Sequence, residues 1–203
     1  AAIDRALRYG KERIQFGAPL VEKEGYLLKL IVPSWIDLVA GRAYVEDIAL
    51  RIDQGETDMA VEGSVAKLWC TAAGNRAADA ALQALGGYGY SREYMVEKIR
   101  RDVRITSIYE GTSEIQQNII GVFRWKKTVS SKGAFYEEMA SACDAVHAEN
   151  AATGADLAAA ALRGVGDAVM TAHRTRAIRH QIAQFELADA MSRAEVAASL
   201  SRK

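Results

Sequence analysis

Apolar residues recur along most of the chain at intervals of three and four, the spacing that places them on one face of an α-helix. The pattern predicts helices over about residues 1–14, 23–54, 59–85, 91–101, 113–127, 135–150, 155–180 and 182–202. Within the second of these, the spacing is followed by Trp35, Leu38, Val39, Arg42, Val45, Ala49 and Ile52, with Arg42 the one polar residue among them. Long helices with short connections are typical of an antiparallel bundle, so we expect an all-α fold.

Glycine and proline mark the connections between these helices. The loop Phe16–Pro19 ends the first helix, and Gly86 stands where a C-terminal capping glycine is expected after the third. Pro33 falls inside the second predicted helix, where it is expected either to kink the helix or to mark its first turn.

Composition narrows the possible functions. The chain has 203 residues, 50% of them hydrophobic, so it can bury a core. Lys plus Arg (26) equals Asp plus Glu (26), which gives no electrostatic argument for nucleic-acid binding. No apolar run is long enough to span a bilayer. Cys70 and Cys143 have no metal-ligand spacing, so we expect two thiols in a reducing compartment and no metal site.

The segment Ile108–Gln116 carries the best candidate for chemistry. Glu110 stands on a turn directly before a predicted helix start. Ser113 is expected to cap that helix, with Gln116 completing a capping box, and Gly111 permits a positive φ or close approach of a ligand. An acid held in this way can act as a general base, although the same pattern also occurs as an ordinary capped turn.

Three further segments accompany this turn: Arg13–Gly17 (RIQFG), Gln83–Tyr90 (QALGGYGY) and Arg101–Ile105 (RDVRI). Each is weak by itself. Taken in order with IYEGTSEIQ, they resemble the C-terminal helical domain of acyl-CoA dehydrogenases, which are FAD-dependent flavoproteins. The resemblance runs from the first residue to about Trp125, and residues 126–203 lie outside it.

The resemblance assigns roles to the turn. It implies that Glu110 is the base that removes the α-proton of an acyl-CoA thioester, while FAD accepts the β-hydride. Gly111 corresponds to the family's substrate-contacting glycine, and Thr112, Ser113 and Glu114 to its flavin-contacting segment. From its position alone, Glu114 is a first-turn acid stabilised by the helix dipole, and we do not assign it as the base.

The resemblance also implies a cofactor-binding surface. Arg13 corresponds to an arginine that contacts FAD phosphate, often that of a neighbouring subunit, and Phe16 to a flavin-adjacent position. The resemblance assigns binding of the adenosine side of FAD, across a dimer interface, to the segment Gln83, Ala84, Leu85, Gly86 and Gly87. From the residues alone, Arg13 is a cation at a helix end and the glycine pair is a helix stop. The family often has Gln where Glu24 stands here, so Glu24 is left out of the site.

For the whole protein, the resemblance implies an acyl-CoA dehydrogenase that passes electrons to an electron-transferring flavoprotein and forms a homodimer or homotetramer. It would lie in the bacterial cytoplasm, or in the mitochondrial matrix of a eukaryote. Family members carry two further domains before this region, so we expect the chain to be a fragment that is inactive alone. One alternative is an acyl-CoA oxidase-like enzyme, reoxidised by oxygen. Another is a non-catalytic helical interaction domain of the same fold.

The remainder of the chain follows the polar segment Ser130–Gly133, which is typical of a linker. We therefore expect a bundle domain at residues 1–129 and a helical extension at 130–203. The extension's apolar stripe is rich in alanine and contains no Trp, so it is expected to pack against the bundle or a second subunit rather than on a membrane. A basic, solvated helix face is expected to hold His173, Arg176 and His180.

Overall fold

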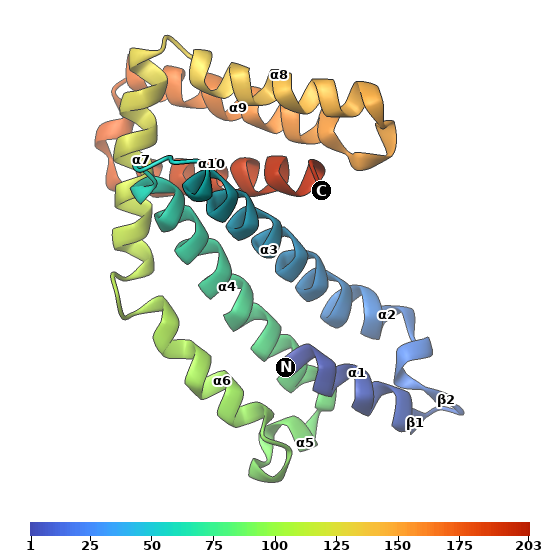
Figure 1. Ribbon diagram of the computed structural model, residues 1–203. Helices are drawn as coiled ribbons and strands as arrows, with labels where there is room; N and C mark the ends of the chain where they lie inside the picture. The colour runs from blue at the N-terminus through green and yellow to red at the C-terminus, as the bar shows by residue number, and fades with distance from the viewer. The chain divides into compact units, whose positions relative to one another are not determined.

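A computed structural model describes residues 1–203, and the chain is almost entirely helical (Figure 1). The longer helices are α1 Ala2–Glu12, α3 Val32–Asp53, α4 Ala60–Leu85, α6 Val96–Arg104, α7 Ser113–Ser130, α8 Ala134–Glu149, α9 Ala155–Arg174 and α10 Gln181–Ser201. The shorter ones are α2 Glu24–Tyr26, α5 Gly87–Tyr90, a π turn at Leu27–Ile31, and 3-10 turns at Leu20–Glu22, Arg92–Tyr94, Ile105–Ser107, Ala151–Thr153 and Ala177–Arg179. Strands β1 Ile14–Gln15 and β2 Ala18–Pro19 form one antiparallel hairpin. The predicted all-α fold is confirmed.

The helices pack as two compact units. Unit 1 comprises Ala1–Val39 and Cys70–Glu110, and unit 2 comprises Ala40–Trp69 and Gly111–Lys203. Helices α3 and α4 therefore each contribute to both units. The predicted boundary between residues 129 and 130 falls next to the turn that joins α7 to α8, inside unit 2. The division into a bundle domain and an extension stays a prediction.

The core of unit 1 is built around α1, α4 and the segment that leads into α3. Its buried residues are Ala2, Ile3, Ala6, Tyr26, Ile31, Ala81, Ala84, Leu85 and Val96. The Tyr26 hydroxyl donates a 2.7 Å hydrogen bond to the Ala6 carbonyl. A Cβ at Gly10 would lie 2.8 Å from the Tyr26 ring, so a glycine is needed where this ring crosses α1.

Pro33 sits in the first turn of α3, directly after the π turn Leu27–Ile31. The Val32 N–H bonds to the Leu27 carbonyl, five residues back. Proline has no N–H to donate, and in a regular α-turn its ring would clash with the carbonyl of Lys29. The wider turn relieves that clash, and helical backbone continues on both sides of it. Pro33 therefore lies in the first turn of α3, one of the two places expected for it, and the helical backbone before it is of the π type.

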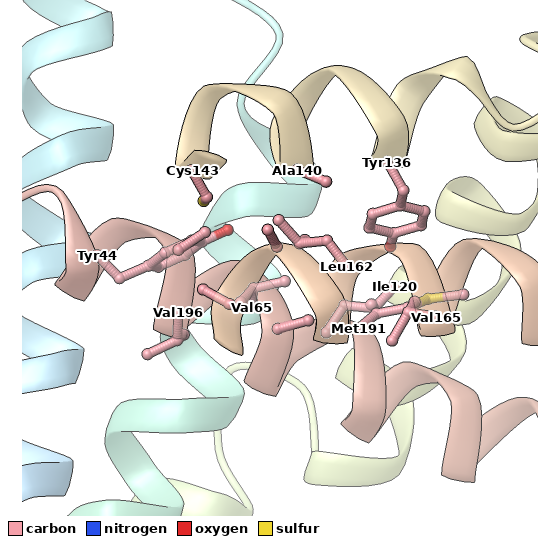
Figure 2. Close-up of a cluster of buried hydrophobic side chains, with 14 of the residues drawn as sticks. Tyr44, Val65, Ile120, Tyr136, Ala140, Cys143, Leu162, Val165, Met191 and Val196 are labelled. Carbon is pink, nitrogen blue, oxygen red and sulfur yellow. The ribbon is translucent and has the colours of Figure 1, made fainter. Parts of the chain in front are cut away.

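The core of unit 2 joins α7–α10 to the adjoining parts of α3 and α4. Figure 2 shows Tyr136, Ala140 and Cys143 pointing from α8 toward Leu162 of α9, with side chains of α3, α4, α7 and α10 in the same cluster. Helices α8 and α9 lie side by side (Figure 1). Close packing of α7 and α10 needs Gly121, where a Cβ would lie 2.6 Å from Cγ of Gln184. The expectation that residues 134–203 pack against bundle helices is confirmed within this unit.

Two local expectations are wrong. Ser91 does not start α6, because the residue before that helix is Met95 in the left-handed conformation (φ +61°). Helix α9 does not continue to residue 180, because Arg176 has φ +63° and interrupts it. Consequently His173, Arg176 and His180 do not share one helical face. The Trp125 indole donates a 3.2 Å hydrogen bond to Nδ1 of His173.

The two cysteines form no disulfide, Cys70 being exposed and Cys143 buried in the unit 2 core. None of the helices combines the length and the apolar character needed to cross a membrane.

Candidate functional site

The turn that carries Glu110 has an unusual backbone. Glu110 has φ +52° and Gly111 has φ +86°. Glycine adopts a positive φ readily, whereas a glutamate there is uncommon, and such residues cluster at functional sites. The Glu110 side chain is exposed and stands just before the N-terminus of α7, a helix of 18 residues. The turn therefore presents an acid at a surface next to the first amides of a long helix.

The cap of α7 differs by one residue from the prediction. The helix begins at Ser113 as expected, but the capping side chain is Thr112, whose Oγ1 accepts from the Ile115 N–H at 3.4 Å. With Thr112 as the cap, Ile115 occupies the third helical position and no capping box forms. Gln116 is buried instead, and its Nε2 lies 3.5 Å from the Gly111 carbonyl oxygen as a donor. The predicted pairing of Ser113 with Gln116 is wrong.

Lys67, which no sequence motif identifies, also contacts this turn. Nζ of Lys67, in α4, donates to the Gly111 carbonyl oxygen at 2.5 Å. The only local signal is that Lys67 interrupts an otherwise apolar run, Val65-Ala66-Lys67-Leu68-Trp69. Nothing in that run indicates which backbone group the lysine reaches.

In unit 1, Arg13 and Phe16 lie at the end of α1 and at the tip of the hairpin. Arg13 is exposed and its N–H bonds to the Tyr9 carbonyl, which ends the helix. Phe16 (φ +51°) and Gly17 (φ +79°) form the two-residue loop between the paired strands. Positive φ at both central residues is the geometry of a type I′ turn. Phe16 is 91% exposed, so an aromatic ring projects from a turn that glycine or asparagine would occupy more easily.

The glycine loop after α4 is shaped by two of its glycines. Gly86 ends α4 with φ +60°. A Cβ at Gly89 would lie 2.2 Å from the Leu82 carbonyl oxygen, so only glycine lets α5 rest against the end of α4. A Cβ at Gly86 or Gly87 would meet nothing within 4 Å, so these two positions face open space.

The loop lies close to α1 through three tyrosines. Tyr88 stacks on Tyr94 with ring centroids 4.8 Å apart, and Tyr9 meets Tyr88 edge-on at 5.9 Å. Tyr9 is one turn before Arg13, so two of the predicted cofactor-binding segments lie on neighbouring elements of unit 1. The predicted Gln83, Gly86 and Gly87 are exposed, whereas the side chains of Ala84 and Leu85 are buried in the core. Only the backbone of these two buried residues is left to contact a cofactor.

The remaining predicted residues, Gly111, Thr112, Ser113 and Glu114, belong to unit 2. Glu114 is exposed in the first turn of α7, as expected for an acid favoured by the dipole. No group of three or more His, Cys, Asp or Glu residues is placed to hold a metal ion.

A buried charge network in unit 2 was also missed. Arg124 of α7 donates from Nε and Nη2 to the two oxygens of Glu195 in α10, both at 2.8 Å, and from Nη2 to Glu62 of α4 at 3.0 Å. The hydroxyls of Tyr44 and Tyr136 donate to Glu195 at 3.3 and 3.2 Å. These five residues join five helices, α3, α4, α7, α8 and α10.

Burial and pairing act against each other in this network. Burial opposes the charge of Arg124, but Glu195 and Glu62 raise the pKa of its guanidinium above the usual value. Burial alone would raise the pKa of Glu62, yet the charge of Arg124 holds it below its usual value. Burial raises the pKa of both tyrosines. Arg124 lies between the two carboxylates, and Glu62 also faces the partly exposed Arg51 at 3.5 Å. The five residues themselves are buried and their charges are paired, which makes the cluster a structural element and not a reaction site.

Known protein families and relatives match the N-terminal part of the chain. Residues 1–123 match the family model "Acyl-CoA dehydrogenase, C-terminal domain". The chain is 39% identical over 120 residues to a 3-(aryl)acrylate reductase of Clostridium sporogenes, covering 59% of this chain and 31% of the relative. It is 36% identical over 126 residues to the Caffeyl-CoA reductase-Etf complex subunit CarC of Acetobacterium woodii, covering 62% and 33%. The chain thus spans about a third of the length of these relatives.

One solved structure resembles nearly the whole chain. The acyl-CoA dehydrogenase of Bacillus anthracis, complexed with FAD, matches with a TM-score of 0.76 and covers 99% of this chain and 39% of its own. At 20% identity the similarity concerns the fold alone. It extends to α8–α10, which lie beyond the residues that the family model matches.

Proposed function

The chain belongs to the acyl-CoA dehydrogenase family, and from this we propose that it forms the C-terminal helical part of a flavoprotein that dehydrogenates acyl-CoA thioesters between the α and β carbons. The observation that carries the proposal is Glu110, an exposed acid at positive φ directly before α7. The whole protein's substrate, activity and partners are part of the proposal.

Glu110 suits the role of the base for a chemical reason. The α-proton of a thioester is removed by a group within hydrogen-bond reach of the α-carbon, and a carboxylate can accept it. The exposed side chain leaves room for a substrate to approach, and the positive φ of Glu110 and Gly111 directs the chain sharply into α7. A bound acyl chain would exclude water from the turn and so limit side reactions with solvent.

Each unit by itself carries residues that fit FAD chemically. In unit 1, Arg13 is an exposed cation suited to a pyrophosphate, and Gly86 and Gly87 face open space that a cofactor can approach. In unit 2, the segment Thr112–Glu114 offers the first amides of α7. When bound, FAD supplies the acceptor for the β-hydride, which no protein side chain can provide. Phe16 and Gln83 complete the proposed contacts, together with the backbone of Ala84 and Leu85.

The proposed partners follow the family. The substrate is an acyl-CoA, the electron acceptor an electron-transferring flavoprotein, and the assembly a homodimer or homotetramer in the bacterial cytoplasm or the mitochondrial matrix. The name of the Acetobacterium woodii relative includes an Etf complex, which supports the acceptor. That name also denotes a reductase, which makes reduction of an α,β-unsaturated acyl-CoA a second candidate that uses the same groups in reverse.

The test is the variant Glu110→Gln in the complete flavoprotein, meaning this chain joined to the preceding domains that the family carries. Glutamine is nearly isosteric, so FAD should stay bound and the flavin absorbance should be retained. Anaerobic titration with straight-chain and branched acyl-CoAs should bleach the wild-type flavin and leave that of the variant unchanged. The exposed Glu138 on α8 provides a matched control, Glu138→Gln, which should bleach normally.

Bleaching of Glu110→Gln at the wild-type rate would move the base elsewhere. Rapid oxygen consumption by the substrate-reduced enzyme would favour the oxidase alternative over transfer to a flavoprotein. Bound flavin that no acyl-CoA or enoyl-CoA reduces or reoxidises would favour a non-catalytic interaction domain.

A further inference from the structure

The turn that holds Glu110 is tied to α4 by one cationic side chain. Lys67 and Gly111 are 44 residues apart in the sequence, and their Nζ and carbonyl oxygen lie 2.5 Å apart. The same oxygen is approached by Nε2 of Gln116 at 3.5 Å. Lys67 is half-buried, so its ammonium is partly removed from competing water. A hydrogen bond from a charged donor is about twice as strong as one between neutral groups.

This bond controls the orientation of one peptide plane. In a trans peptide the carbonyl and the N–H point in opposite directions. With the Gly111 carbonyl held toward α4, the Thr112 N–H is directed away from α4. Rotation of this peptide would change ψ of Gly111, a residue whose own φ is +86° and which follows Glu110 at +52°. Glycine opposes such rotation less than any other residue, so a side chain that holds the Gly111 carbonyl from another helix has its largest effect at this position.

We propose that Lys67 is a positioning residue for Glu110, fixing the Gly111 peptide and with it the direction of the Glu110 carboxylate and of the Thr112 amide. The inference rests on the proposed role of Glu110 as the base. Lys67 itself takes no proton from the substrate. Its effect is to hold the acid in one geometry, and a misplacement of about 1 Å can slow a reaction about 100-fold.

The local part of the inference is tested on this chain by NMR. In wild type, the side-chain ¹⁵Nζ of Lys67 should show scalar coupling to the Gly111 carbonyl carbon, because the two share a hydrogen bond. Lys67→Met should abolish the coupling and shift the Gly111 carbonyl and Thr112 amide resonances. Lys98, which is exposed on α6, provides the matched control Lys98→Met, which should leave both resonances in place. An unshifted Gly111 carbonyl in Lys67→Met would overturn the inference.

The functional part is tested in the complete flavoprotein with butyryl-CoA and octanoyl-CoA as probes. Lys67→Met should lower the limiting rate of flavin reduction between about 10- and 100-fold while KM changes by less than about threefold, because orientation is lost and not binding. Lys67→Arg, which retains a cationic donor, should recover most of the rate. Lys98→Met should match wild type.

A merely structural lysine would give a different result. It would lower the melting temperature and the FAD content and leave the rate per bound flavin unchanged, which would refute the positioning role. Wild-type reduction by Lys67→Met together with an inactive Glu110→Gln would refute this inference alone. Wild-type reduction by Glu110→Gln would refute the proposed function.

Discussion

Replacing Glu195 with glutamine should destabilise unit 2 strongly although the two side chains have the same shape. Glu195 is 2% exposed and accepts two hydrogen bonds from Arg124 and one each from Tyr44 and Tyr136. Removing one partner of a buried ion pair costs about 3–5 kcal/mol, because the other charge stays buried. Glu62 remains 3.0 Å from Arg124 and offsets part of that cost, so we expect a loss near the lower end, about 3 kcal/mol.

The assay is thermal unfolding followed by circular dichroism and by tryptophan fluorescence in a Trp35→Phe background, which leaves Trp69 and Trp125 of unit 2 as the fluorophores. For a chain of this size, 1 kcal/mol corresponds to about 2–4 °C, so Glu195→Gln should lower Tm by about 6–12 °C. The control is Glu137→Gln, which removes the charge that faces Arg163 on the exposed side of α8. Solvent screens that pair, so its Tm should stay within the scatter of repeated melts.

Equal melting temperatures of Glu195→Gln and Glu137→Gln would contradict the predicted contribution of the buried pair between Glu195 and Arg124. It would mean that Glu62 alone satisfies the buried guanidinium and that α10 is held by apolar packing. A double variant, Arg124→Met with Glu195→Leu, adds a second check. It should be more stable than Arg124→Met alone, because that single variant leaves both Glu195 and Glu62 buried without the guanidinium that pairs with them.

Three further predictions follow from the same structure. The pKa of Glu62 lies below its usual value of 4.5, so its ion pair stabilises the fold above that pH, and this contribution is lost as the pH falls. The melting temperature should therefore drop more steeply between about pH 5 and pH 3 in wild type than in Glu62→Gln. Gly89→Ala should unfold the glycine loop or weaken its packing, because the new Cβ would lie 2.2 Å from the Leu82 carbonyl oxygen. Gly87→Ala should be tolerated, because that position faces open space. Near-UV circular dichroism, which reports on the stacking of Tyr88, should change in the first variant and not in the second. The purified 203-residue chain should be colourless after incubation with FAD, because its proposed contacts supply only part of a flavin site; a stoichiometric flavin spectrum would contradict this.

The helices of this chain could be predicted closely because their signals are local. The apolar spacing and the polar connector before Met59 predict a helix over 59–85, and α4 is Ala60–Leu85. Gly86 follows it at positive φ, as a capping glycine should. Each of these features depends on residues that are within one or two turns of each other, where side-chain periodicity and backbone freedom decide the outcome.

Helix ends were harder to predict because adjacent residues compete for the same role. Thr112 and Ser113 can both accept the capping hydrogen bond, and the structure uses Thr112. A one-residue shift of the cap removes Gln116 from the capping box and buries it against the turn. The interruption of α9 at Arg176 has even less local signal, since arginine is a good helix former and neither glycine nor proline is nearby.

The charged residues discussed above form two groups: those that a local sequence motif identifies, and those whose partners are distant in the sequence and are seen only in the folded structure. Glu110 and Gly111 were identified because the turn itself, an acid and a glycine before a helix, contains the information. Lys67, Arg124 and Glu195 were missed because their partners lie 44 to 71 residues away and each resembles a solvated charge in its own helix. Burial decides their roles, and burial is a property of the packed unit that no short window of sequence encodes. The Lys67 contact therefore bears on function in a way that the motif alone cannot: the sequence identifies the candidate base, and the fold supplies the group that can hold it in place.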